Sequence, residues 1–363
     1  MSTSYRPARL TIHAASLRHN LQVARDAAPQ SKVMPAIKAD AYGHGILQTA
    51  EILEDADGFI VACLSEAIEL RAARIEQTLL VIQGHQCVQD LIIAAEKNIR
   101  LVIHSEAQLA LLDQLAAQIV KVALKLDTGM HRLGIPAHLA ATIYRKLQAH
   151  PNIHPDIWLM THLACADDLR NPYTNQQISL FEQATESLTA PRTIANSAGI
   201  LGWSQSHRDW VRPGIMIYGS SPFAYAGHDK ARDSLKLKAS MTLQAPLIAI
   251  KKLQKGDAIG YGSAWICPQD MQVGVVACGY ADGYPRHAPS GTPLWLNGKR
   301  SRLLGRVSMD LIIIDVDNIN AQPGDLVECW GKAINVDEVA HLSETISYEL
   351  FCHAGNSCTK RYL

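Results

Sequence analysis

Short runs of apolar, often β-branched residues alternate with longer amphipathic stretches over the first two thirds of the chain. Apolar runs of strand length occupy 33–39, 58–64, 78–84, 99–105, 120–127, 157–164, 192–196 and 211–219. Between them apolar residues recur with helical spacing, as in 65–75 and 105–118. Before the first run, Ser16 could cap a helix that carries Leu17, Leu21 and Ala24 on one face. Continuous apolar strands separated by helices are typical of a parallel sheet covered on both faces. About eight such strands predict a (β/α)8 barrel.

The pattern changes near residue 230. Strand-like segments then follow one another with only short Gly, Pro, Asn or Asp turns between them, at 236–253, 272–281, 293–307 and 311–319. This spacing predicts a mostly antiparallel β-domain. The charged stretch 228–238 is the expected boundary, so we assign residues 1–233 to the barrel and 234–363 to the β-domain.

Composition narrows the class of protein. A chain of 363 residues is long enough for two domains. Lys and Arg together number 34, as do Asp and Glu, so no global field favours nucleic acid or an anionic membrane, and a small neutral or zwitterionic ligand is expected. The eight cysteines are scattered and form no CxxC pair, which predicts reduced thiols and no metal site. The N-terminus lacks an apolar signal region, and no apolar stretch has membrane-spanning length, so we expect a cytoplasmic protein.

Lys38 is the first candidate for chemistry. It follows the apolar run 33–37 and precedes Tyr42, Gly43 and Gly45. An amine beside an apolar strand is desolvated, which favours its neutral form, a nucleophile able to form a Schiff base with an aldehyde cofactor or a carbonyl substrate. From this segment alone, a structural lysine whose amine reaches water is equally favoured.

Further polar residues follow the other predicted strands, where the catalytic groups of a barrel lie. Lys125 lies inside the apolar run 120–127 and Arg132 follows it, His162 lies at the end of the next run, Ser197 at the end of another, and Arg212 in the last. Each alone has a structural explanation, because a lone histidine is more often a core residue and an arginine more often an ion-pair partner. Their common placement favours a single site.

These residues suit an anionic, heterocyclic ligand. Ser197 with the backbone amides of Gly214 and Ile215 would form a phosphate cradle, to which Tyr42 could add a hydroxyl donor. Arg212 can face a ring nitrogen without releasing its proton, which would weaken the ring as an electron sink.

Eight segments in order identify a family. The chain resembles the alanine racemases, pyridoxal-phosphate enzymes of fold type III, over nearly its whole length. The resembling segments are AIKADAYGHG, LKLDTGMHRLG, THLACAD, ANSAGIL, VRPGIMIYG, GYGSAW, CGYADGYPR and GRVSMD. The resemblance implies a (β/α)8 barrel followed by a β-domain, and interconversion of L-alanine and D-alanine for peptidoglycan supply or for D-alanine breakdown.

The resemblance also implies roles for the strand-end residues. The cofactor would be held by Lys38 through a Schiff base, by Tyr42, Ser197, Gly214 and Ile215 at its phosphate, and by Arg212 at its pyridine nitrogen, with His162 behind Arg212. Arg132 and the backbone of Met309 would hold the substrate carboxylate. Lys125 corresponds to a lysine that is often carbamylated in the family, which would convert a cation into an anion able to orient Arg132.

Four residues of the β-domain would act in the other subunit. By resemblance, Tyr261 is the second catalytic base, opposite Lys38, while Tyr280 and Asp310 line the entrance corridor. In the family these residues and Met309 come from the partner subunit, so the resemblance implies a homodimer with shared active sites and proton exchange between two bases.

The chain departs from the family pattern at two places. Asp40 stands where many relatives have Asn, and the C-terminus carries Asn356 or Ser357 near a position that is Tyr in some relatives, without the usual proline. A smaller residue there could widen the pocket, so a racemase of broader specificity that accepts serine is an alternative. A fold-type III amino-acid decarboxylase is a weaker one, since it would be expected to carry other segments in place of GYGSAW and GRVSMD.

Overall fold

Eight parallel strands form a sheet within the part of the chain that the computed structural model describes, residues 6–223 and 235–363. Their spatial order is β2 (Lys32–Val33), β10 (Trp210–Val211), β9 (Arg192–Thr193), β8 (Trp158–Met160), β6 (Lys121–Asp127), β5 (Arg100–Ile103), β4 (Thr78–Val81) and β3 (Gly58–Val61). A parallel backbone bridge between Ala36 and Ile60 joins the two edges, which nearly closes the sheet into a barrel. The short strand β7 (Ile135–Pro136) pairs with β6.

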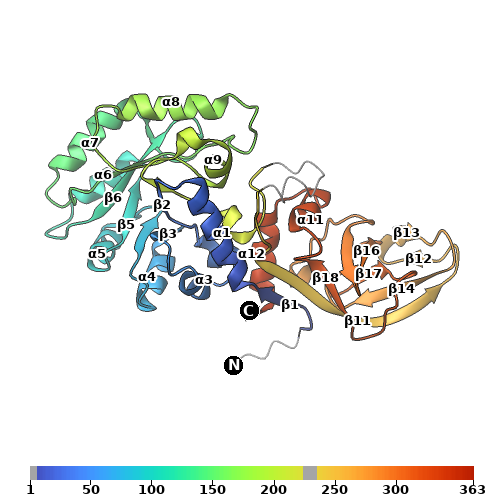
Figure 1. The fold of residues 1–363 in the computed structure, drawn as a ribbon. Helices are drawn as coiled ribbons and strands as arrows, with labels where there is room; N and C mark the ends of the chain where they lie inside the picture. Colours follow the sequence, from blue (N-terminus) through green and yellow to red (C-terminus); the bar gives the residue numbers. More distant parts are fainter. Residues whose placement is uncertain (1–5, 224–234) are drawn as a thin grey trace.

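Helices connect these strands and cover the sheet (Figure 1). They are α1 (Ala14–Ala27), α3 (Ile46–Ile52), α4 (Leu64–Ala72), α5 (Val88–Glu96), α6 (Glu106–Leu112), α7 (Ala140–Ala149), α8 (Tyr173–Thr185) and α9 (Ser197–Gly202). Because both faces of the strands are covered, strands such as β3 and β5 are buried along their whole length. The predicted barrel is therefore confirmed.

The strands are shorter than the apolar runs that predicted them, and two local predictions were wrong. Lys38 does not end a strand, because the chain leaves β2 after Val33 and Lys38 instead begins the turn α2 (Lys38–Gly43). Ser16 does not cap α1, because that helix already begins at Ala14 and Ser16 is buried within it. Ser105, by contrast, caps α6 by accepting a hydrogen bond from the N–H of Gln108.

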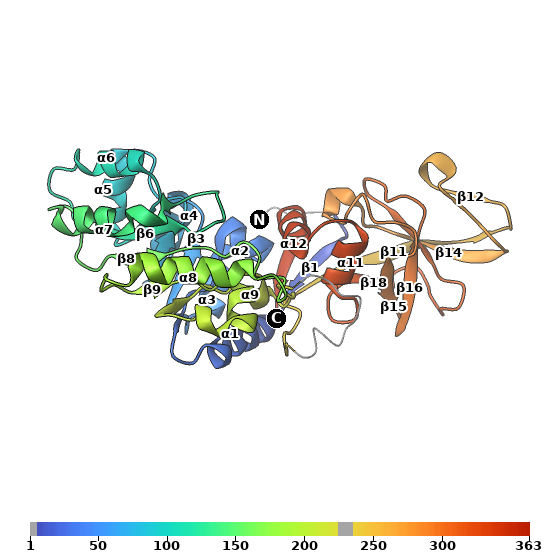
Figure 2. The same cartoon turned by 90° about the horizontal axis from the view of Figure 1, so that it is seen from above.

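The second sheet is mostly antiparallel, as predicted. Its strands, in spatial order, are β14 (Met271–Val276), β17 (Ile312–Asp315), β16 (Lys299–Leu304), β15 (Pro293–Leu296), β18 (Leu326–Trp330), β11 (Met241–Leu253), β1 (Arg9–Ile12) and β19 (Thr359–Tyr362). A further pairing of β11 with β14 closes part of this sheet into a barrel. The hairpin of β12 (Ala258–Ile259) and β13 (Trp265–Ile266) projects from its far end (Figure 2).

Elements from both chain ends join the two halves. The strand β1 pairs in antiparallel fashion with β11 and in parallel with β19. The helices α11 (Val336–Leu342) and α12 (Ser347–Ser357) lie between the barrel and the second sheet (Figures 1 and 2). The predicted domain boundary between residues 233 and 234 lies outside the described residues.

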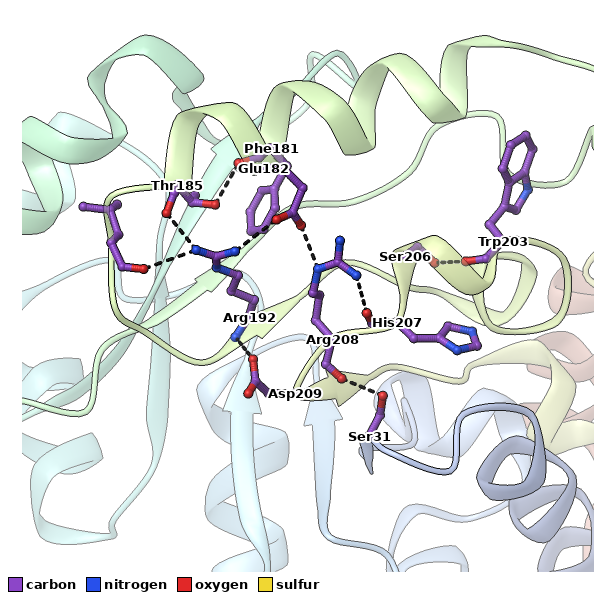
Figure 3. A network of polar contacts seen from close by, with 11 residues as sticks. Ser31, Phe181, Glu182, Thr185, Arg192, Trp203, Ser206, His207, Arg208 and Asp209 are labelled. Carbon is purple, nitrogen blue, oxygen red and sulfur yellow. Dashed lines mark hydrogen bonds and ion pairs between the residues drawn. The ribbon is translucent and has the colours of Figure 1, made fainter.

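A polar network ties α8 to the strands β9 and β10 (Figure 3). Glu182 accepts hydrogen bonds from Arg192 at 3.0 Å and from Arg208 at 2.7 Å. The backbone N–H of Arg192 donates to Asp209 at 2.8 Å, and Ser31 donates to the carbonyl of Arg208. These bonds hold together the two strands that precede Ser197 and Arg212.

The helix α12 packs closely on the turn α2. A Cβ atom on Gly355 would lie 2.2 Å from the Cα of Gly43, and one on Gly43 would lie 2.2 Å from the carbonyl oxygen of Phe351. Backbone therefore meets backbone here, and neither side can move without displacing a helix or the turn that carries Lys38.

We predict that Gly355→Ala lowers the free energy of unfolding by about 1–3 kcal/mol, because the added methyl group overpacks this contact. Thermal and denaturant unfolding of the purified variant would measure the loss. His353→Ala is the matched control, since His353 is exposed on the same helix. Equal stability of Gly355→Ala and the parent protein would contradict the close contact.

Candidate active site

A cavity of about 720 Å³ lies at the carboxyl ends of the barrel strands. This volume is suitable for a small cofactor together with a substrate. The structure brings into its lining the predicted residues Lys38, Tyr42, Lys125, Arg132, His162, Ser197, Arg212, Gly214 and Ile215. Residues of α11 and α12, among them Tyr348, line the same cavity.

Lys38 begins a left-handed turn. Ala39, Asp40, Ala41 and Tyr42 have φ between 52° and 54°, although none is glycine. Each such residue costs about 1–2 kcal/mol relative to a right-handed conformation, so surrounding contacts must hold the turn. One of them is Glu66 on α4, whose Oε1 accepts from the N–H of Ala39 at 2.7 Å while its Oε2 accepts from the N–H of Ala62.

The amine of Lys38 is shifted toward its neutral form. Burial lowers its pKa most, the nearby guanidinium of Arg132 lowers it further, and Glu66 opposes the shift. The cavity therefore holds a lysine whose nucleophilic form is more accessible than that of a surface lysine.

Ser197 organises an anion cradle at the start of α9. Its Oγ accepts hydrogen bonds from the N–H of Gly214 at 2.8 Å and of Met216 at 3.4 Å, which leaves its own proton available to a ligand. The amide of Gly214, expected to face a phosphate directly, is thus engaged by Ser197 in this structure.

Tyr42 supplies a second hydroxyl beside that cradle. A Cβ atom on Gly214 would lie 3.0 Å from the hydroxyl of Tyr42, so the glycine allows the phenol to approach the backbone. Burial raises the pKa of Tyr42, which keeps the hydroxyl protonated as a donor. Its ring packs against that of Tyr218, with centroids 4.7 Å apart.

Arg212 is held rigidly by the barrel. Its NH1 donates to Thr193 Oγ1 at 2.6 Å, and its NH2 donates to the carbonyl oxygens of Thr161 at 2.7 Å and Ile194 at 3.0 Å. Within the described residues nothing hydrogen-bonds its Nε, so this N–H remains available to an acceptor in the cavity. Burial lowers the pKa of Arg212 to about 10, which leaves it a cation at neutral pH.

His162 lies beside that guanidinium, with its Nδ1 3.4 Å from NH2 of Arg212. Burial and then the charge of Arg212 lower the pKa of His162 well below its ordinary value. The imidazole is therefore neutral at physiological pH, and its Nδ1 can accept from Arg212.

Lys125 lies on β6 and is almost fully buried. Burial lowers its pKa to about 8, with Arg212 and Arg132 adding to the shift. Among the salt bridges of residues 6–223 and 235–363, none involves Lys125. A buried amine among cations is thus shifted toward its neutral, reactive form.

The remaining predicted residues do not join this cavity. Tyr261 lies between β12 and β13 and is 68% exposed, and Met309 is 53% exposed. Tyr280 lies beside Met309, because the N–H groups of Tyr280 and Ala281 donate to the carbonyl oxygens of Ser308 and Met309. Asp310 is exposed and binds Arg6. Figure 2 shows the β12 hairpin at the opposite end of the molecule from the (β/α)8 barrel.

Several residues of the site were not predicted. Thr193 orients Arg212, and Glu66 holds the Lys38 turn, yet neither belongs to a recognisable motif. Glu66 could have been found as an acidic residue in the first turn of a helix that follows a barrel strand. Asn356 and Ser357 do not line the cavity of the single chain.

In the described part of the chain, no group of three or more His, Cys, Asp or Glu side chains could hold a metal ion. None of the helices described is long and apolar enough to cross a membrane.

Comparison with known proteins links both halves of the chain to one family. Residues 12–222 match the family described as alanine racemase, N-terminal domain, and residues 240–362 match the alanine racemase C-terminal domain. The alanine racemase of Halorhodospira halophila is 46% identical over 350 residues, which cover 96% of this chain and 95% of that protein. The catabolic alanine racemase of Pseudomonas putida is 45% identical over 351 residues, which cover 96% of this chain and 97% of that protein. The crystal structure of the biosynthetic alanine racemase from Pseudomonas aeruginosa has a TM-score of 0.93 at 40% identity and covers 99% of both chains.

The burial of Lys125 predicts a pH-dependent stability. Its pKa in the fold, about 8, is below the ordinary 10.5, so between these values the unfolded chain binds a proton that the fold does not. The free energy of unfolding therefore rises with pH across this window. Below the window the fold bears the whole cost of burying the charged amine. Lys125→Met should be more stable than the parent protein near pH 7, and the difference should shrink toward pH 10.

Denaturant unfolding of the cofactor-free protein in bicarbonate-free buffer at several pH values would measure this difference. Lys121→Met on the same strand is the control, because Lys121 is only partly buried. A stability difference that stays constant with pH would contradict the lowered pKa.

Proposed function

The chain belongs to the alanine racemase family, and we propose that it interconverts L-alanine and D-alanine with pyridoxal phosphate and two bases from different subunits. The observation that carries this proposal is the cavity itself. It combines an amine shifted toward neutrality, a hydroxyl cradle for a phosphate and an arginine with a free Nε.

The residues present fit pyridoxal phosphate. The cofactor supplies an electron sink that acidifies the α-hydrogen of a bound amino acid. Lys38 would bind its aldehyde, the hydroxyls of Ser197 and Tyr42 with the amide of Ile215 would bind its phosphate, and Arg212 would donate through Nε to its pyridine nitrogen.

Arg212 also tunes the reaction. As a guanidinium backed by neutral His162, it keeps its proton and does not protonate the ring nitrogen. By leaving the ring nitrogen unprotonated, Arg212 would make the cofactor a weaker electron sink, which should favour racemisation over transamination.

The two bases would stand on opposite faces of the α-carbon. We propose that Lys38 removes the α-proton from D-alanine while Tyr261 of the partner subunit delivers a proton to the opposite face. In the reverse reaction Tyr261 removes the α-proton from L-alanine and Lys38 delivers one. A tyrosine hydroxyl acts as a base near neutral pH only where positive charge or hydrogen-bond donors stabilise the phenolate, and the guanidinium groups of Arg132 and Arg212 supply positive charge in the lining of the cavity.

A homodimer completes this site. Tyr261, Tyr280, Met309 and Asp310 are exposed and lie outside the cavity of their own chain, as residues that serve the other subunit would. In the dimer the backbone of Met309 and the guanidinium of Arg132 would hold the substrate carboxylate, while Tyr280 and Asp310 would line the entrance.

Carbamylation of Lys125 is the proposed source of an anion beside Arg132. A neutral amine is needed to react with carbon dioxide, and the lowered pKa of Lys125 provides it. The resulting carbamate would orient Arg132 toward the substrate.

The metabolic role depends on whether the reaction forms or consumes D-alanine. Relatives named biosynthetic and catabolic are similar to this chain to comparable degrees. We propose that the enzyme serves D-alanine supply for peptidoglycan or D-alanine breakdown, with serine as the alternative substrate.

We predict that purified protein converts L-alanine into D-alanine and that dialysis against a carbonyl reagent followed by added pyridoxal phosphate removes and restores the activity. A coupled D-amino-acid oxidase assay would measure the product, with L-serine as a parallel substrate. Release of carbon dioxide in place of D-alanine would support a decarboxylase and refute the proposal.

Mixing two inactive variants tests the shared site. Lys38→Ala and Tyr261→Phe should each reduce kcat by about 100-fold or more, the range for loss of a general base. After the two variants are unfolded together and refolded, heterodimers should regain one intact site of two. A base used by its own chain would give no recovery. Tyr173→Phe, which alters a tyrosine outside the cavity lining, is the control.

Arg212→Glu tests the tuning of the cofactor. A carboxylate would stabilise a protonated ring, so racemisation should fall by about 10-fold or more while the ratio of transamination to racemisation rises. Pyruvate formation and D-alanine formation would be measured on the same sample, with Arg192→Glu as the control for loss of a partly buried arginine contact outside the cavity lining. An unchanged ratio of transamination to racemisation would contradict this role for Arg212.

A further inference from the structure

The turn that begins with Lys38 is fastened to the last strand of the chain. Asp40 of the turn forms an ion pair with Lys360 of β19, 320 residues away. The other carboxylate oxygen of Asp40 accepts a hydrogen bond from the N–H of Ile46 at 2.7 Å. One side chain thus joins the middle of the turn both to α3 and to the C-terminal strand.

The strand β19 makes a second contact with the segment that leaves the turn. The hydroxyl of Tyr362 donates to the carbonyl oxygen of His44 at 2.9 Å. Lys360 and Tyr362 are two residues apart, so they lie on the same face of the strand. Parallel pairing with β1, where Leu10 stands opposite Lys360, anchors the strand itself.

Both ends of the turn therefore have an anchor. Glu66 holds the N–H of Ala39 at its start, and β19 holds Asp40 and His44 further along. A run of four left-handed, non-glycine residues is intrinsically unfavourable, so the turn keeps its shape through these anchors together with the packing of α12.

We propose that Lys360 is a positioning residue for Lys38, acting through its ion pair with Asp40 to hold the left-handed turn that places Lys38 at the cavity. The proposal rests on the proposed function, since it takes Lys38 as the reacting amine. The side chains of Lys360 and Asp40 are 19% and 38% exposed, so water screens this ion pair only in part.

A positioning residue affects kcat more than the stability of the fold, whereas a purely structural residue affects mainly the stability. Displacement of a reacting group by about 1 Å can lower a rate about 100-fold, even where the fold remains intact. Loss of the ion pair should therefore alter the dynamics of the turn and kcat more than it alters global stability or the KM for alanine.

The test compares Lys360→Met with Lys360→Arg. In cofactor-free protein, hydrogen exchange of the peptide covering residues 39–47 should become roughly 10-fold faster in Lys360→Met, because the N–H of Ile46 loses a fixed acceptor. In the holoenzyme, kcat should fall about 10-fold while KM changes less than about 2-fold. Lys360→Arg should retain both properties, because it keeps the charge.

Two further variants separate the ion pair from other effects. Arg361→Met removes a neighbouring cation of the same strand that does not contact the turn, and it should behave like the parent protein. The double variant Asp40→Asn/Lys360→Met eliminates the charge of Asp40 that Lys360→Met leaves unpaired. It does not restore the ion pair, so kcat and slow exchange should remain impaired. Recovery of kcat and of slow exchange in the double variant would overturn the proposal.

The exchange measurement needs neither cofactor nor substrate, so it remains informative if the protein proves not to be a racemase. In that case faster exchange in Lys360→Met supports the anchor, while the function itself is refuted. Unchanged exchange in Lys360→Met, or faster exchange with unchanged kcat, would show that Lys360 does not position Lys38. Asp40→Asn gives the same comparison should Lys360→Met fail to fold.

Discussion

The burial of several cationic groups beside one another governs the chemistry of this cavity. Lys38, Lys125, Arg132 and Arg212 line one space, and the two lysines respond to burial and to their cationic neighbours with lowered pKa values. The arginines retain their charge, so the cavity combines accessible neutral amines with an excess of positive potential. Such a site favours a ligand that brings its own anions, and pyridoxal phosphate and an amino-acid carboxylate meet that requirement together.

The two functional ends of the cavity are held by different means. Arg212 is fixed by hydrogen bonds to the side chain of Thr193 and to the carbonyl oxygens of Thr161 and Ile194, which directly follow the barrel strands β8 and β9. Lys38 lies on a strained turn that keeps its shape only through contacts with α4, α12 and β19. The second half of the chain therefore contributes to the geometry of its own barrel site, in addition to the residues proposed to serve the partner subunit.

Periodicity predicted the barrel because its strands are buried on both faces and are therefore continuously apolar. It could not predict the turn at Ala39 and Asp40, since alanine has no intrinsic preference for a left-handed conformation and only tertiary contacts impose it. The strand-end rule predicted where Arg212 and Ser197 would lie, but not the contact of Thr193 that orients Arg212 or the contact of Glu66 that holds the Lys38 turn. The role of Tyr261 came from resemblance alone, because an exposed tyrosine in a hairpin carries no signal of catalysis.

Association of two chains and catalysis are linked in the proposed dimer. A single chain contains the cavity proposed for the cofactor, yet it leaves Tyr261, Ile266, Met309 and Leu311 in contact with water. Burying such apolar surface favours association, and it brings the second base to the α-carbon in the same event. A monomer could therefore bind the cofactor through Lys38 and still lack one of the two bases. Loss of racemisation on dilution would then reflect the dissociation of subunits rather than the loss of cofactor, because the two processes depend on different contacts.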